Sequence, residues 1–154
     1  MSVLVAAINV LSNWGVESSN IYITLYAREL GSSNLQVGFI GATAGIAYLL
    51  SSLFFGRLSD IHGRMKYIRA GLGLTAISYL SQIFANSPYS LLAARGLIYF
   101  CLGINASVLV AYTFENQRQV GRFISFGALG WLIGAMTAAA TRDYHALFII
   151  SAAV

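Results

Sequence analysis

One short polar stretch decides the fold of this chain. It reads Gly-Arg-Leu-Ser-Asp-Ile-His-Gly-Arg-Met-Lys and runs from Gly56 to Lys66. Apolar runs flank it at 35–55 and 68–85, and each is near the ~20 helical residues that cross a bilayer. The pattern therefore predicts a tight polar turn between two membrane-spanning helices.

The composition of the whole chain agrees with a membrane protein. Of its 154 residues, 58% are hydrophobic and only 9% are charged, whereas a soluble domain carries roughly 25% charged residues. The nine Lys and Arg residues are spread along the sequence, so they form no continuous face for a nucleic acid. Cys101 stands alone, which excludes a disulfide framework and a cysteine metal site.

The apolar runs predict an all-α, polytopic transmembrane bundle. Five full spans are expected, at 3–26, 35–55, 68–85, 90–112 and 123–141. A sixth run, 146–154, would extend only about 14 Å as a helix, against a hydrocarbon core of about 30 Å. We therefore expect residues 1–154 to be a fragment whose last helix is incomplete. The first residues lack a basic segment and a cleavage site, which predicts a retained first span.

The basic residues predict an orientation in the membrane. Counted by alternate loops, one side carries six of them and the other side two. The first set is Arg57, Arg64, Lys66, Arg69, Arg118 and Arg122, and the second is Arg28 and Arg142. By the positive-inside rule, the N-terminus is expected in the cytoplasm.

The 56–66 stretch resembles the signature of the major facilitator superfamily, Gly-x-x-x-Asp-x-x-Gly-Arg followed by basic residues, between helices two and three. The resemblance implies the N-terminal six-helix half of a secondary transporter in the plasma membrane. A C-terminal half would complete a central site for a small-molecule substrate, and no cofactor or metal is implied. Ile61 and Met65 depart from the pattern, at places where the family often has basic residues.

Five residues of this stretch form the expected cytoplasmic-gate motif: Gly56, Asp60, Gly63, Arg64 and Lys66. Glycine permits close backbone approach and a left-handed turn, and the cations suit anionic headgroups or a carboxylate partner. In the family, the carboxylate that Asp60 matches lies near a helix N-terminus of the other half. The alternative is an ordinary turn with inside-positive charges.

Polar side chains form a stripe along the first span. They recur at intervals of three or four residues, which places them on one helix face: Asn9, Asn13, Glu17, Asn20 and Thr24. Such a stripe indicates a bundle interior or a pathway for substrate or protons. The alternative for the asparagines is hydrogen bonding that only holds helices together.

Arg95, followed by Gly103, resembles the arginine-bearing fourth helix of the same family. A charge within a membrane helix usually faces a cavity or a carboxylate, although Arg95 is near enough to the expected helix end to reach the interface. We predict that Arg95 joins the stripe in a substrate or proton-coupling cavity. We also predict that it pairs with Glu17.

Small residues mark packing faces on two spans. Gly130, Gly134 and Ala138 form one ridge, with Gly127 nearby, and this ridge permits close helix packing. Gly38, Gly41 and Gly45 form a second, in the expected second span. Gly134 is followed by alanine, whereas proton antiporters of the family commonly have proline there, and this difference argues against an antiporter.

Three functions follow in order of preference. The first is secondary active transport of a small solute by alternating access. The second is a split or truncated membrane protein that acts only as an interaction or assembly half. A membrane-embedded enzyme comes last, because the polar residues form no recognisable set of nucleophile, metal ligands or acid and base.

Overall fold

The computed structural model describes residues 3–117, 119–141 and 143–154, and these ranges are helical and contain no strand. The prediction of an all-α bundle is therefore confirmed. Arg118 and Arg142, which were counted among the loop charges, lie outside the described residues. The chain divides into two compact units, one of residues 24–109 and the other of the remainder. Each unit is described by itself.

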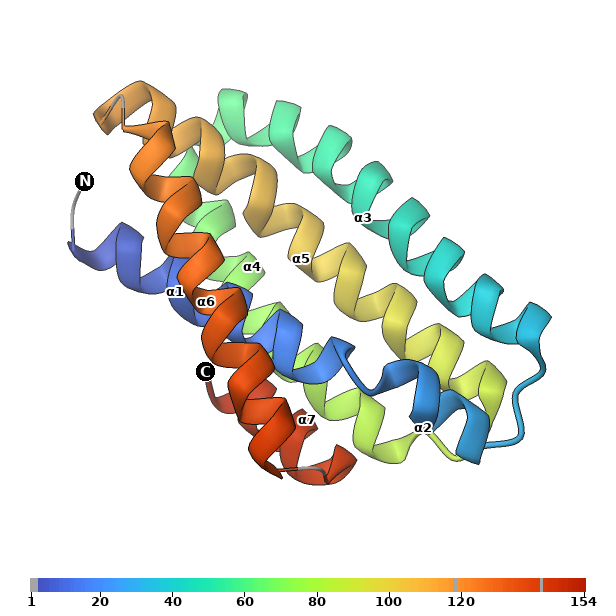
Figure 1. Cartoon of the computed structure of the whole chain (residues 1–154). Helices are drawn as coiled ribbons and strands as arrows, with labels where there is room; N and C mark the ends of the chain where they lie inside the picture. Colours follow the sequence, from blue (N-terminus) through green and yellow to red (C-terminus); the bar gives the residue numbers. More distant parts are fainter. Residues whose placement is uncertain (1–2, 118, 142) are drawn as a thin grey trace. The chain divides into compact units, whose positions relative to one another are not determined.

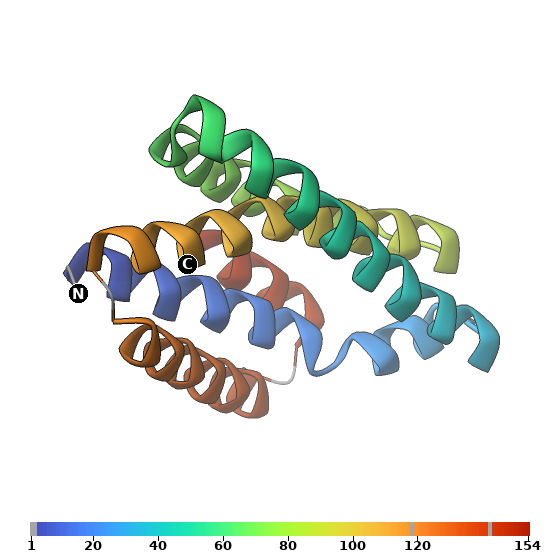
Figure 2. The same ribbon diagram turned by 90° about the horizontal axis from the view of Figure 1, so that it is seen from above.

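The first unit combines the two ends of the chain. It contains α1 (Val3–Asn20), α6 (Val120–Thr141) and α7 (Tyr144–Ala153). Figure 2 shows α6 running beside α1, and α7 also packs against α1. Asp143 caps α7, because its carboxylate accepts hydrogen bonds from the next main-chain amides, and an aspartate at this position stabilises a helix start.

The second unit contains the helices from the middle of the chain. They are α2 (Ile23–Glu29), α3 (Asn34–His62), α4 (Arg64–Leu80), the short 3₁₀ helix η1 (Ser81–Phe84) and the first part of α5 (Pro88–Gln117). Figure 1 shows α3 alongside α5. Ser51 Oγ donates to the carbonyl oxygen of Phe100 at 2.6 Å. A side chain on Gly103 would meet Ser51, so glycine permits this close approach.

Three of the described helices are long and apolar enough to cross a membrane: α3, α5 and α6. The expected first span is divided, since α1 ends at Asn20 and α2 begins at Ile23. The expected third span corresponds to α4 and its continuation η1. Large apolar side chains such as Phe39, Leu49 and Phe54 are exposed on α3, as they would be on a helix that faces lipid.

The predicted loop between the second and third spans is wrong in its length. Residues 56–67 were expected outside both helices, but α3 continues through His62 and α4 begins at Arg64. Only Gly63 separates them, with φ at +92°. Polar residues do not by themselves end a helix, whereas a backbone conformation that L side chains rarely adopt does. The motif is therefore a helical corner with one glycine between the two helices.

Candidate functional site

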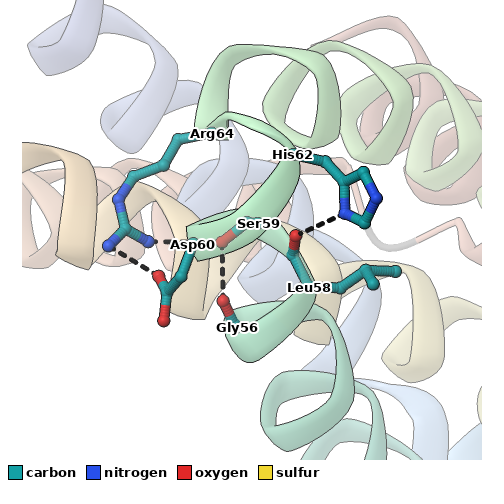
Figure 3. A network of polar contacts seen from close by, with 6 residues as sticks. All are labelled: Gly56, Leu58, Ser59, Asp60, His62 and Arg64. Carbon is teal, nitrogen blue, oxygen red and sulfur yellow. Dashed lines mark hydrogen bonds and ion pairs between the residues drawn. The ribbon is translucent and has the colours of Figure 1, made fainter.

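Three of the motif residues, Gly56, Asp60 and Arg64, are linked by polar contacts that pass through Ser59 (Figure 3). Arg64 Nη2 lies 2.7 Å from Asp60 Oδ1, and Arg64 Nη1 donates to Ser59 Oγ at 3.2 Å. Ser59 Oγ in turn donates to the carbonyl oxygen of Gly56 at 2.7 Å. The first residue of α4 is thus bound to the last turn of α3 through a single guanidinium.

The charges of this ion pair oppose the dipoles of the helices that carry them. Asp60 lies in the last turn of α3, where the helix dipole is negative, and Arg64 begins α4, where the dipole is positive. Each position costs roughly 0.3–1 kcal/mol for a lone charge. Pairing offsets that cost. The carboxylate side chain remains 57% exposed, so it can reach a further partner.

The other two motif residues contribute differently. Lys66 is exposed on the first turn of α4. A Cβ on Gly56 would lie 3.5 Å from Ser107 Oγ of α5, an ordinary van der Waals contact. Gly56 therefore lies beside α5, but the space there would also accept the Cβ of an alanine.

The polar stripe of α1 and the glycine ridge of α6 meet each other. Asn9, only 5% exposed, donates through Nδ2 to the carbonyl oxygen of Phe123 at 2.5 Å. Asn13 Nδ2 donates to Asn9 Oδ1 at 2.9 Å. A Cβ on Gly127 would lie 3.1 Å from Asn9 Nδ2. These contacts define what we call the α1/α6 seam.

The ridge continues along the seam beyond Gly127. A Cβ on Gly130 would overlap the carbonyl oxygen of Val10, and one on Gly134 would lie 2.7 Å from the Cβ of Glu17. Glycine at both positions therefore allows the two backbones to touch. Glu17 itself is half-buried at this contact, and Asn20 is the last residue of α1.

Arg95 lies in the second unit, 2% exposed, among polar and aromatic groups. Its Nη1 donates to Gln82 Oε1 at 3.3 Å and its Nη2 to the Tyr99 hydroxyl at 3.1 Å. Its Cζ lies 4.8 Å from the centroid of the Tyr99 ring, within cation–π range. These contacts hold the buried guanidinium inside the second unit.

Sequence reasoning missed both of these partners. Tyr99 follows Arg95 by four residues, which places the two on one face of α5, and that spacing was a usable signal. Gln82 is a lone amide within an apolar run and is fully buried. The predicted pairing of Arg95 with Glu17 joins residues of different units, and it stays a prediction.

The second glycine ridge, on α3, is not packed against another described helix. A Cβ on Gly38, Gly41 or Gly45 would meet nothing within 4 Å. These three residues of α3 are therefore not brought against another helix among the described residues, in contrast to the ridge of α6.

A family model described as "Major Facilitator Superfamily" matches residues 3–154. The chain belongs to the Major Facilitator Superfamily. The match covers both helical units and includes the motif around Gly63, and it favours a transport protein over an enzyme. An apolar, helical chain of this family is an integral membrane protein.

Curated relatives agree with this assignment. The chain is 35% identical over 142 residues to the "Multi-drug resistance efflux pump PmrA homolog" of Lactococcus lactis, with 83% of this chain and 34% of that protein covered. It is 28% identical over 151 residues to the "Multidrug resistance protein MdtG" of Enterobacter lignolyticus, covering 86% and 35%. The "MFS-type transporter clz4" of Cochliobolus lunatus is 32% identical over 119 residues, covering 73% and 21%. The chain spans about a third of the length of the first two relatives.

Proposed function

We propose that this chain is the N-terminal bundle of a secondary transporter that exports drug-like small molecules across the plasma membrane by alternating access. The observation that carries the proposal is the match of residues 3–154 to the family, together with relatives named as multidrug resistance proteins. A C-terminal bundle would supply the opposite wall of the substrate site. The N-terminus and the Gly63 corner face the cytoplasm.

The corner acts as the cytoplasmic gate in this proposal. Asp60 is held by Arg64 yet keeps more than half of its side chain exposed. An exposed carboxylate at a rigid corner can bind a helix N-terminus of the second bundle when the cytoplasmic side closes, and release it when that side opens. Gly63 fixes the angle at which the carboxylate is presented.

The cavity residues have two different roles in the proposal. Asn9 and Asn13 hold α1 against α6, so they keep one wall of the pathway rigid. Glu17 and Arg95 supply the charges that contact substrate or couple protons. On the polar face of α1, Asn9 and Asn13 thus serve packing, and Glu17 serves transport.

The test uses the full-length protein in bacteria that lack their main efflux pumps. We expect cells that make the protein to export a fluorescent lipophilic dye faster than cells with an empty vector, and to lose the difference when a protonophore collapses the proton gradient. Equal efflux in both strains, at a verified membrane level of the protein, contradicts the proposal. Efflux that survives the protonophore contradicts only its coupling to protons.

The roles of Glu17 and Arg95 have their own test in the same assay. Glu17→Gln is expected to abolish gradient-driven efflux while it leaves the protein level unchanged. If the two residues pair, reversing both charges together restores part of what Glu17→Arg or Arg95→Glu loses alone. Unchanged efflux in Glu17→Gln makes Glu17 a packing residue of the α1/α6 seam.

A further inference from the structure

A groove lies in the first unit between the beginnings of α1 and α6. Its volume is about 520 Å³, within the range of sites that bind small molecules. The α1 wall includes Ala6, Ala7 and Val10, and the α6 wall consists of Phe126 and Arg122. Apart from Arg122, the side chains that line the groove are apolar, and none of the described lining residues is acidic.

The depth of the groove separates it from a transport site. Its α1 wall runs from Val3 to Leu11, which is about 12 Å of helix rise. Arg122 is two residues beyond the start of α6, or about 3 Å. The groove thus lies within the first turns of α1 and α6, whereas substrate sites of secondary transporters lie near the midplane of a hydrocarbon core of about 30 Å.

The charge at the mouth of the groove selects its occupant. Arg122 is exposed, and its Nη1 donates to the neutral side-chain oxygen of Gln119 at 3.5 Å. A guanidinium recognises a phosphate through paired hydrogen bonds, and it repels a lipophilic cation. An acyl chain fits the apolar walls, where Ala6 and Ala7 leave space. Basic pockets between membrane helices bind anionic headgroups on the cytoplasmic side.

We propose that this groove binds an anionic phospholipid, with one acyl chain along α1 and Phe126 and the phosphate on Arg122. The proposal rests on the cytoplasmic side proposed above for the N-terminus, and not on the direction or the substrate of transport. The bound lipid would cover the apolar walls and fix the membrane depth at which α6 begins. The site belongs to the first unit alone.

The direct test maps where lipid binds. The full-length protein is reconstituted with phosphatidylglycerol that carries a photoactivatable acyl chain, illuminated, and digested for mass spectrometry. We expect adducts on the 3–11 segment and on Phe126, and about fivefold fewer with the same label on phosphatidylcholine, because an arginine near the surface favours anionic lipid by that order. Adducts confined to other helices, or equal labelling by both lipids, overturn the proposal.

Variants separate the groove from general attraction of anionic lipid. Arg122→Gln removes the cation and Ala7→Trp fills the space, and each is expected to reduce phosphatidylglycerol adducts about fivefold. Arg69→Gln is the matched control, because it removes an exposed arginine from α4. It should leave adducts at the groove unchanged. An equal loss in Arg69→Gln and Arg122→Gln means nonspecific attraction and contradicts the site.

Discussion

Asn9 Nδ2 donates a hydrogen bond of 2.5 Å to the main-chain carbonyl oxygen of Phe123 and so joins α1 to α6 across 114 residues of sequence. The donor is 5% exposed, and Gly127 leaves the space in which its amide lies. The α1/α6 seam therefore combines an amide hydrogen bond with close backbone contact, two devices by which helices associate in lipid.

Loss of this hydrogen bond should weaken the seam. We expect Asn9→Ala to lower the free energy of unfolding by about 0.6 kcal/mol and by no more than about 1.7 kcal/mol, the mean and the maximum for hydrogen bonds between membrane helices. The measurement is thermal unfolding of the purified full-length protein in detergent, followed by tryptophan fluorescence. Asn9→Leu keeps a side chain of similar size but has no hydrogen-bond donor, so it should also destabilise. Unchanged unfolding in both variants means that the bond contributes nothing.

The glycine ridge predicts a contrast within one helix. Gly130→Ala places a methyl group against the carbonyl oxygen of Val10, whereas a Cβ on Gly121 meets nothing within 4 Å. Overpacking of this kind typically costs 1–3 kcal/mol. We expect Gly130→Ala to lower the unfolding temperature and Gly121→Ala to leave it equal or higher, because alanine favours helix. Equal effects of the two substitutions on the unfolding temperature would mean that packing of α1 against α6 does not require glycine at position 130.

Exchanging the charges of Asp60 and Arg64 should affect stability and transport differently. In the double variant Asp60→Arg with Arg64→Asp, each charge lies at the helix end that favours it. We expect the variant to unfold at the same temperature as the native protein or higher, yet to lose efflux because the carboxylate has moved. Thermal unfolding and dye efflux are measured on the same preparations. Retained efflux means that the position of the carboxylate is unimportant.

The aromatic partner of Arg95 predicts a graded series. Tyr99→Phe keeps the ring under the guanidinium but removes the hydroxyl that accepts at 3.1 Å, and Tyr99→Leu removes both contacts. A cation–π contact is worth roughly 0.5–2 kcal/mol. We expect unfolding temperature and efflux to fall in the order native, Tyr99→Phe, Tyr99→Leu. A leucine variant as stable as the phenylalanine variant would exclude a contribution from the ring.

Much of the fold follows from the sequence, because lipid allows few ways to satisfy a backbone. Apolar runs of sufficient length predict the helices, and the spacing of Gly56, Asp60 and Gly63 identifies the family. Helix ends were less predictable. The polar residues before Gly63 looked like loop, but they continue α3, since a helix that leaves the bilayer need not stop.

The contacts between side chains of different helices could not be predicted from the sequence, for a physical reason. The stripe that includes Asn9 and the ridge that includes Gly130 are each visible by periodicity, but periodicity does not state which face meets which. The contact between them depends on the packing of α1 against α6. Gln82 shows the same limit, because a lone amide in an apolar run carries no sign of its partner Arg95.

The efflux rate of Asp60→Asn in the full-length protein, at a matched membrane level, shows whether the Asp60 carboxylate acts as a gate. The substitution keeps the size of the side chain and removes its charge, so the latch on the second bundle should be lost. We predict that efflux falls to the vector level. The control is Asp143→Asn, because asparagine also caps a helix well, and it should transport normally. Normal efflux in Asp60→Asn contradicts the gate and, with it, the proposed role of the corner at Gly63.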